Sequence, residues 1–356
     1  MRGGRTGFTT GTCAAAAAKA AAMLLSTGQS PGEIEVGLPD GSRVKLRVER
    51  VAGDADSAEA SVRKDAGDDP DVTDGCLITA RLEWDRKGDV SFFAGEGVCT
   101  VTKPGLSVQP GEPAVNPVPR RMIRDAVREV TGRGVRVTVS VERGRELASK
   151  TFNPRLGVEG GLSILGTSGI VRPFSTPALR DALKCALSVA TACNVSAPVF
   201  VPGRIGDRAA RNFFQLSPEQ LVEVSNEWGF VLDEAAGAAF SRVLVLGHPG
   251  KLAKLPEGWW DTHSSRSGNA VPAVLGLARE ILGRDLSESP TVEGIFKDLS
   301  AGDRRALADS LAGRIRRAVC ARVQERFEVS VVLVNMRGTL LGLDGDLTAW
   351  QRNAEP

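Results

Sequence analysis

The sequence predicts an α/β and α+β protein of two domains, in which a mainly β, α+β domain precedes an α/β domain. The chain has 356 residues, about twice the length of an average domain. Short alternating apolar runs fill the region from Glu33 to about Val101, which is typical of strands. After about Gly157, strand and helix patterns alternate, which indicates a largely parallel, Rossmann-like sheet. We therefore place the domains at residues 1–157 and 158–356.

The elements of the first domain follow from local patterns. Val44, Leu46 and Val48 alternate with basic residues and form the clearest strand. The proline-rich stretch 104–119 lacks the N–H groups that a regular ladder needs, so we expect an extended connection there. Pro119 stands where a first helical position would be, and an apolar stripe continues to Gly132, which predicts a helix. A strand over 135–141 follows.

The second domain repeats strands and helices. Ser217 and Gln220 form a capping box around Pro218, which predicts a helix that ends at Gly229. The other elements that we expect are, in chain order, a strand at 162–165, a helix from about 177, strands at 198–201, 230–232 and 243–246, helices at 270–282 and 304–327, and a last strand at 329–334.

Composition limits the chemistry. Lys and Arg number 45 against 43 Asp and Glu, a net charge of +2, which argues against nucleic-acid binding. The chain has 40 glycines, two histidines and no tyrosine, so a three-histidine zinc site is excluded and backbone groups are the more abundant ligands. The six cysteines form no C-x-x-C pair, so we expect reduced thiols and no protein-bound metal.

We expect a cytoplasmic protein with no membrane segment. Lys19 interrupts the alanine run that starts at Ala14, which argues against a signal peptide. No apolar stretch approaches the roughly 20 residues of a membrane span.

Two segments near the N-terminus could hold a ligand. Residues 5–13 are rich in threonine and lead into an alanine-rich helix, with Thr10 or Thr12 as its cap, so that carboxylate or phosphate could bind at the helix end. Alternatively, these threonines only satisfy their own backbone. Residues 64–75 are acidic, but their spacing does not match a calcium loop. An Asx turn and a substrate-facing loop stay open for them.

Three further segments follow strands of the second domain. The turns at 166–169 and 247–250 bring backbone N–H groups to a strand end, where a nucleotide can bind, although neither has the complete G-x-G-x-x-G pattern. The segment from His248 to His263 contains both histidines of the chain. Residues 202–211 contain three arginines that suit carboxylates. The alternatives are a histidine bonded to backbone, solvated lysines and structural salt bridges.

In this order, the segments resemble the CbiD family of cobalt-precorrin-5B C(1)-methyltransferases, which act in cobalamin biosynthesis. The residues that carry the resemblance are 5–16, 64–73, 103–105, 111–120, 153–155, 160–173, 247–254 and 262–264. The resemblance implies S-adenosylmethionine as the methyl donor, a cobalt-bearing tetrapyrrole as the acceptor, and methylation of ring carbon 1 to give cobalt-precorrin-6A. It also implies that cobalt arrives with the substrate.

On this basis we predict three groups of site residues. The two glycine turns lie side by side at the carboxyl edge of the second-domain sheet and hold the donor through Gly166, Thr167, Ser168, Gly169, Gly247, His248, Gly250 and Lys251. The acceptor lies between the domains and contacts Arg5, Thr9, Thr10, Thr12, Lys64, Arg204 and Arg208. His263, or failing it Asp65 or Asp68, removes a proton after methylation.

Two other functions stay open. A nicotinamide-dependent precorrin reductase would also use glycine turns at strand ends, and a non-catalytic tetrapyrrole-binding protein would use the same arginines. Titration with S-adenosylmethionine and with NADPH separates these functions from methyl transfer. A homodimer and transient contacts with neighbouring pathway enzymes are both compatible with the sequence.

Overall fold

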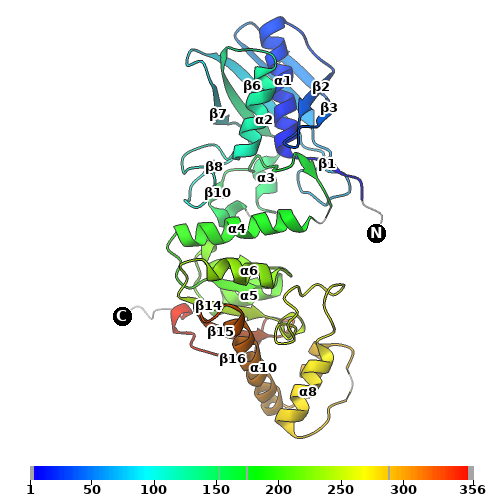
Figure 1. The fold of residues 1–356 in the computed structure, drawn as a ribbon, viewed down its shortest axis with the longest axis vertical. Helices are drawn as coiled ribbons and strands as arrows, with labels where there is room; N and C mark the ends of the chain where they lie inside the picture. Colours follow the sequence, from blue (N-terminus) through cyan, green and yellow to red (C-terminus); the bar gives the residue numbers. More distant parts are fainter. Residues whose placement is uncertain (1–3, 152, 174, 288, 352–356) are drawn as a thin grey trace. The chain divides into compact units, whose positions relative to one another are not determined.

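The chain forms two compact units, Met1–Thr176 and Pro177–Pro356 (Figure 1). They are described by a computed structural model that covers residues 4–151, 153–173, 175–287 and 289–351. The boundary lies after the predicted one at residue 157, because the segment that follows pairs with the first unit. Val158 pairs with Val101, and Ile170 pairs with Phe8.

The first unit contains a five-stranded sheet with strand order β4-β5-β6-β9-β7, in which only the β7–β9 pair is parallel. The strands of the whole unit are β1 (Gly7–Phe8), β2 (Glu33–Gly37), β3 (Arg43–Arg47), β4 (Arg50–Gly53), β5 (Ser57–Arg63), β6 (Leu77–Asp85), β7 (Val90–Ala94), β8 (Thr100–Val101), β9 (Gly134–Val141), β10 (Val158–Glu159) and β11 (Ile170–Val171). Its helices are α1 (Thr10–Thr27), α2 (Pro117–Arg128), α3 (Gly144–Ala148) and the 3-10 turn η1 (Asn153–Leu156).

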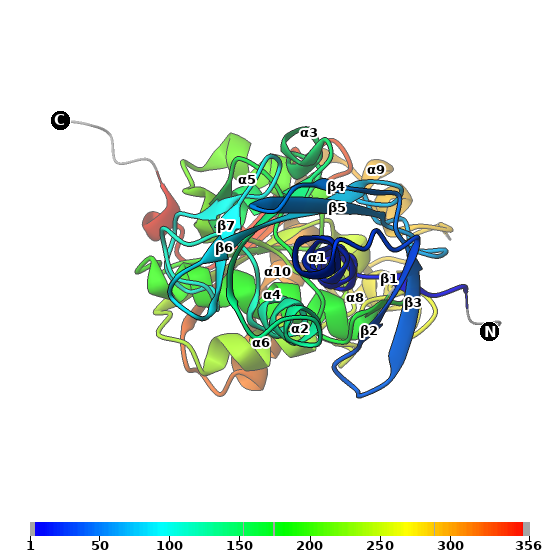
Figure 2. The same cartoon turned by 90° about the horizontal axis from the view of Figure 1, so that it is seen from above.

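Helix α1 is the centre of the first unit. Alanine has the highest helix propensity, and residues Cys13 to Ala18 have no exposed surface. Such small side chains allow close packing against β5, β6 and α2. Seen end-on in Figure 2, α1 lies between β5 and α2. The helix cap is Thr9, and not Thr10 or Thr12, because the Thr9 Oγ1 accepts the backbone N–H of Thr12 at 3.2 Å.

The second unit contains a sheet with strand order β13-β12-β14-β15-β16. The first four strands are parallel and β16 is antiparallel. The elements are α4 (Thr176–Ala192), β12 (Val199–Val201), α5 (Arg204–Phe213), η2 (Pro218–Gln220), β13 (Leu221–Glu223), α6 (Trp228–Ala236), β14 (Arg242–Gly247), α7 (Pro249–Leu252), α8 (Val271–Leu282), α9 (Val292–Lys297), α10 (Ala301–Arg322), β15 (Glu328–Val334), β16 (Leu340–Asp344) and η3 (Thr348–Trp350).

This sheet is buried on both faces. Along β14, Val243 and Val245 belong to one apolar cluster, and Leu244 and Leu246 belong to another. A continuous apolar run is therefore what a parallel strand between two layers requires. The carboxyl ends of β12 and β14 lie next to each other, and the strand order reverses there, since β13 pairs on the other side of β12.

Several predicted elements are wrong. Ser217 does form the capping box, but the turn ends at Gln220 because the next residues pair with β12 as strand β13. The predicted strand at 230–232 lies inside helix α6. Residues 162–165 form only single bridges, from Leu162 to Val98 and from Ile164 to Val115, and they belong to the first unit. Strand β16 was not predicted. No helix among the described residues is long and apolar enough to cross a membrane.

Candidate functional site

The predicted N-terminal segments meet at the start of helix α1. The Thr10 Oγ1 accepts the backbone N–H of Leu165 at 2.9 Å, and the Thr12 Oγ1 donates to the carbonyl of Gly169 at 2.6 Å. The Thr9 N–H also donates to the Gly169 carbonyl, at 3.1 Å. Thr10 and Thr12 are buried in these contacts, so they position the turn that follows Leu165.

The turn at 166–169 therefore belongs to the first unit, and the prediction that it follows a strand of the second domain is wrong. Gly166 has a φ of +140°, and a Cβ added there would lie 2.2 Å from the Thr9 Oγ1. The position thus requires glycine to pack against Thr9, the cap of α1. Thr167 and Ser168 are at the tip of the turn, and both are exposed.

The acidic loop lies against the N-terminal strand of the same unit. Arg5 Nη1 lies 2.5 Å from Asp65 Oδ2, and the Arg5 backbone N–H donates to Asp68 Oδ2 at 2.6 Å. The hydrogen bond from Arg5 lowers the pKa of Asp65, so this carboxylate stays ionised and is a weak base. Arg5, Asp65 and Asp68 form a cluster of charged groups at the start of α1, and all three are exposed to solvent.

Lys64 is buried, with 2% of its surface exposed, and its Nζ lies 2.7 Å from Asp71 Oδ2. Burial raises the pKa of Asp71, but the charge of Lys64 and hydrogen bonds from Lys64 and Thr73 outweigh this effect and lower it. Lys64 thus holds the acidic loop together through a buried ion pair.

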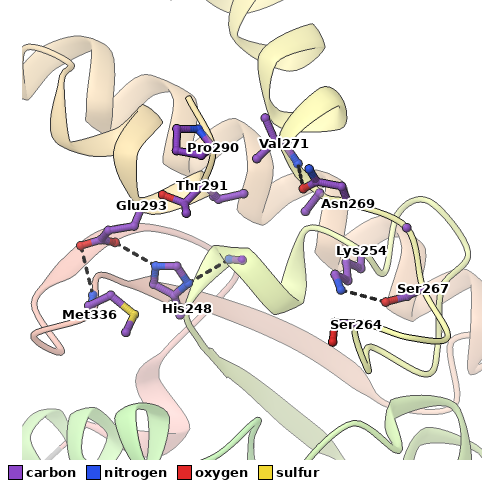
Figure 3. A pocket seen from close by; sticks show the side chains of 14 residues that line it. His248, Lys254, Ser264, Ser267, Asn269, Val271, Pro290, Thr291, Glu293 and Met336 are labelled. Carbon is purple, nitrogen blue, oxygen red and sulfur yellow. Dashed lines mark hydrogen bonds and ion pairs between the residues drawn. The ribbon is translucent and has the colours of Figure 1, made fainter. Parts of the chain in front are cut away.

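The second unit contains a cavity of about 520 Å³ beside the carboxyl end of β14 (Figure 3). Most small-molecule sites have volumes of about 300–1,000 Å³ and combine apolar walls with a few polar groups. The residues that line this cavity are His248, Gly250, Lys254, Ser264, Ser267, Gly268, Asn269, Ala270, Val271, Pro290, Thr291, Val292, Glu293 and Met336. Its size and mixed lining suit an amphiphilic small molecule.

His248 and Glu293 form one polar end of the cavity. The His248 Nδ1 accepts the backbone N–H of Gly250 at 3.0 Å, so its Nε2 carries the proton that is donated to Glu293 Oε2 at 2.8 Å. Glu293 Oε1 also accepts the Met336 N–H at 3.5 Å. The imidazole therefore joins the start of α7 to the start of α9.

The other polar end contains Lys254, whose Nζ donates to Ser267 Oγ at 2.8 Å and to the Thr262 carbonyl at 3.1 Å. Asn269 lies nearby in Figure 3, with its Oδ1 accepting the Val271 N–H at 3.0 Å. These contacts fix the loop that leads into α8.

Two of the four predicted residues in the 247–251 segment do not line the cavity. A Cβ on Gly247 would lie 2.6 Å from Pro202, so this glycine allows β14 to approach the end of β12. Lys251 is half-buried on α7. Burial and the nearby charge of Lys254 lower its pKa, against the effect of Glu223.

The remaining predicted residues of the second unit do not line the cavity, although His263 precedes the lining residue Ser264. His263 is exposed, and its Nδ1 lies 2.8 Å from Ser265 Oγ. Arg204 and Arg208 lie on α5, directly after β12, and Arg208 donates to the Arg337 carbonyl at 3.4 Å. They are thus in a different unit from Arg5 and the threonines.

Sequence reasoning missed the far wall of the cavity. Glu293, Thr291 and Met336 come from segments that were not singled out in the sequence. The only local signal is Thr291, whose Oγ1 accepts the Gly294 N–H at 3.1 Å as the cap of α9. Within the described ranges, no group of three His, Cys, Asp or Glu side chains is arranged to hold a metal ion.

The chain is similar to known proteins of one family. Residues 1–173 match the CbiD family, and residues 261–345 match the CbiD C-terminal domain. The cobalt-precorrin-5B C(1)-methyltransferase of Syntrophotalea carbinolica is 54% identical over 99% of this chain and 100% of its own length. Its namesake from Alkaliphilus metalliredigens is 39% identical over 95% of this chain and 91% of its own length.

A solved structure is also similar. The cobalamin biosynthesis protein (cbiD) of Archaeoglobus fulgidus is 31% identical, covers 74% of this chain and 83% of its own, and gives a TM-score of 0.39. From the relatives that match along almost their full lengths, we conclude that this chain belongs to the CbiD family.

Proposed function

We propose that this protein is a cobalt-precorrin-5B C(1)-methyltransferase, which transfers a methyl group from S-adenosylmethionine to ring carbon 1 of cobalt-precorrin-5B and so forms cobalt-precorrin-6A. The observation that carries the proposal is the 54% identity, over the whole chain, to a relative with that name. It accounts for the scarcity of histidine, since methyl transfer from a sulfonium depends mainly on positioning and on exclusion of water.

We infer that the second unit binds the donor in the cavity beside β14. When bound, S-adenosylmethionine supplies an activated methyl group. The fit is supported by the cavity's volume of about 520 Å³, by apolar walls such as Val271 and Val292, and by polar groups at both ends. His248 and Glu293 hold the wall between α7 and α9, while Lys254 holds the loop before α8.

We also infer that the second unit has a Rossmann-like arrangement. Four parallel strands whose order reverses beside β12, with apolar clusters on both faces, support it. In open sheets of this kind, ligands bind outside the carboxyl ends of the strands. The cavity lies at that edge, after β14.

We infer that the first unit contributes to binding of the tetrapyrrole through the cluster at the start of α1. Arg5 is the exposed cation of this cluster, and a tetrapyrrole with acetate and propionate arms offers carboxylates that a guanidinium binds well. In the second unit, Arg204 and Arg208 of α5 could serve the same arms. Cobalt enters as part of this substrate.

For the proton that leaves after methylation, His263 is the base that we propose. The ion pair with Arg5 lowers the pKa of Asp65 and makes it the weaker alternative, and Asp68 accepts the Arg5 backbone N–H.

The test is incubation of the purified protein with cobalt-precorrin-5B and methyl-labelled S-adenosylmethionine, followed by mass spectrometry. We expect the tetrapyrrole to gain one labelled methyl group. Titration with NADPH runs in parallel: binding of NADPH without binding of S-adenosylmethionine would favour a reductase. Tetrapyrrole binding with neither small molecule would indicate a non-catalytic carrier.

A further inference from the structure

Lys254 is one of two lysines that are buried within the described part of the chain, with 8% of its surface exposed. It follows helix α7 and lines the cavity of the second unit. Burial of an ammonium is unfavourable unless hydrogen bonds and an opposite charge compensate for it. The two buried lysines differ in how this compensation is achieved.

Lys64, in the first unit, has a carboxylate partner, since its Nζ lies 2.7 Å from Asp71 Oδ2. Lys254 has only neutral partners, the Ser267 hydroxyl at 2.8 Å and the Thr262 carbonyl at 3.1 Å. An ammonium carries three N–H donors. Among residues 4–151, 153–173, 175–287 and 289–351, none supplies a carboxylate or a third acceptor to the Lys254 Nζ, which lies at the cavity wall.

The opposite end of the cavity has the opposite charge. Figure 3 shows Glu293 well apart from Lys254, with Thr291 and Val271 between them. Glu293 interacts with His248 through one oxygen and with the Met336 N–H through the other. An anionic group of a ligand is thus repelled at the Glu293 end and attracted at the Lys254 end.

From this we propose that Lys254 is the anion anchor of the cavity and binds the α-carboxylate of the methyl donor. The assignment rests on the proposed function for the identity of the ligand. A carboxylate at the cavity wall would accept the third N–H of Lys254 and neutralise its buried charge. The ligand's orientation follows, because its amino-acid end then lies beside Ser267 and its other end lies toward Glu293.

The test compares two ligands that differ only in the carboxylate, S-adenosylmethionine and decarboxylated S-adenosylmethionine, by calorimetry on the full chain. We expect the wild-type protein to bind the carboxylate form about 10- to 100-fold more tightly, which is the usual effect of one charge-assisted hydrogen bond. Lys254→Met should bring the ratio of the two dissociation constants to within about threefold of one. Lys254→Gln, which keeps a polar end, should do the same.

Lys297→Met is the matched control, because it removes one positive charge from an exposed position of α9 outside the cavity lining. It should keep the wild-type ratio. Thermal unfolding of each variant shows whether it is folded, and the wild-type ratio can still overturn the anchor if both Lys254 variants unfold.

Equal affinity of the wild-type protein for the two ligands would overturn the anchor and leave the proposed function standing. The anchor is also overturned if a folded Lys254→Met variant keeps the wild-type ratio. If the wild-type protein binds neither ligand, the proposed function fails and the anchor fails with it.

Discussion

The Nε2 of His248 lies 2.8 Å from the Oε2 of Glu293, although 45 residues separate the two along the chain. Because the His248 Nδ1 is already the acceptor for the Gly250 N–H, one imidazole both caps helix α7 and joins it to α9. The starts of α7 and α9 are thus linked by this side chain at one wall of the proposed donor cavity.

His248→Ala should weaken donor binding about tenfold and lower the free energy of unfolding by about 1–2 kcal/mol, since a helix cap and a charge-assisted hydrogen bond are both lost. His248→Asn is the informative comparison, because asparagine can cap α7 but is too short to reach Glu293. We expect it to regain most of the stability and little of the affinity. Equal donor affinity of all three proteins in calorimetry would contradict this role.

Gly166→Ala should destabilise the protein by about 2–4 kcal/mol, because the new Cβ would lie 2.2 Å from the Thr9 Oγ1 at a φ of +140°. Donor affinity should stay unchanged, since the turn lies in the first unit. Gly160→Ala is the control, with a φ of +86° but no atom within 4 Å of the added Cβ. Denaturant unfolding of the two variants separates the clash from backbone strain, and a similar loss in both would argue against the clash.

Glu129→Gln should remove a pH-dependent part of the stability. Glu129 follows α2 and binds Arg43 of β3, with Nη2 2.8 Å from its Oε2, and Lys19 of α1 at 2.5 Å. Hydrogen bonds from Arg43, and then from Lys19, lower the pKa of Glu129 to about 2.

A lowered carboxyl pKa stabilises the folded state above the unfolded-state pKa of about 4.5, and this contribution is lost as the pH falls toward 2. Glu129 is partly exposed, so we expect a loss of only about 1 kcal/mol at pH 7. Unfolding of the variant measured between pH 7 and pH 3 should depend less on pH than that of the wild type. Glu33→Gln removes the same charge from an exposed strand position and should keep the wild-type slope.

His263→Ala should lower kcat about 100-fold or more, as loss of a general base usually does, while donor affinity stays within about twofold of the wild-type value. Asp65→Asn should change kcat by less than about tenfold, because the ion pair with Arg5 makes this carboxylate a weak base. Steady-state turnover with cobalt-precorrin-5B measures both. Normal turnover by His263→Ala would exclude this residue as the base.

The sequence predicted elements well where the local pattern agrees with the tertiary pairing. The apolar run at 243–246 is strand β14, and the stripe at 270–282 is helix α8. The prediction failed at 221–223, because pairing with β12 overrides the helical signal that begins at Ser217.

The candidate site was likewise predicted only where local sequence features define it. The motif around His248 does lie at a cavity, since a glycine turn after a buried strand is a local feature. Glu293 was not predicted, because only the fold brings α9 to that turn. The turn at 166–169 was assigned to the wrong unit, because its contacts are with Thr9 and Thr12, more than 150 residues earlier.

Burial of helix α1 turns Cys13 into a reporter of how the first unit opens. Burial raises the pKa of this thiol to about 12, so little of the thiolate that alkylating reagents attack is present in the folded protein. Because Cys13 has no exposed surface, a reagent can reach it only after helix α1 moves away from the sheet. The labelling rate of Cys13 would therefore measure the opening equilibrium of the first unit directly. Cys185 and Cys320 of the second unit, which are only partly buried, should react without such an opening and serve as the reference in the same sample.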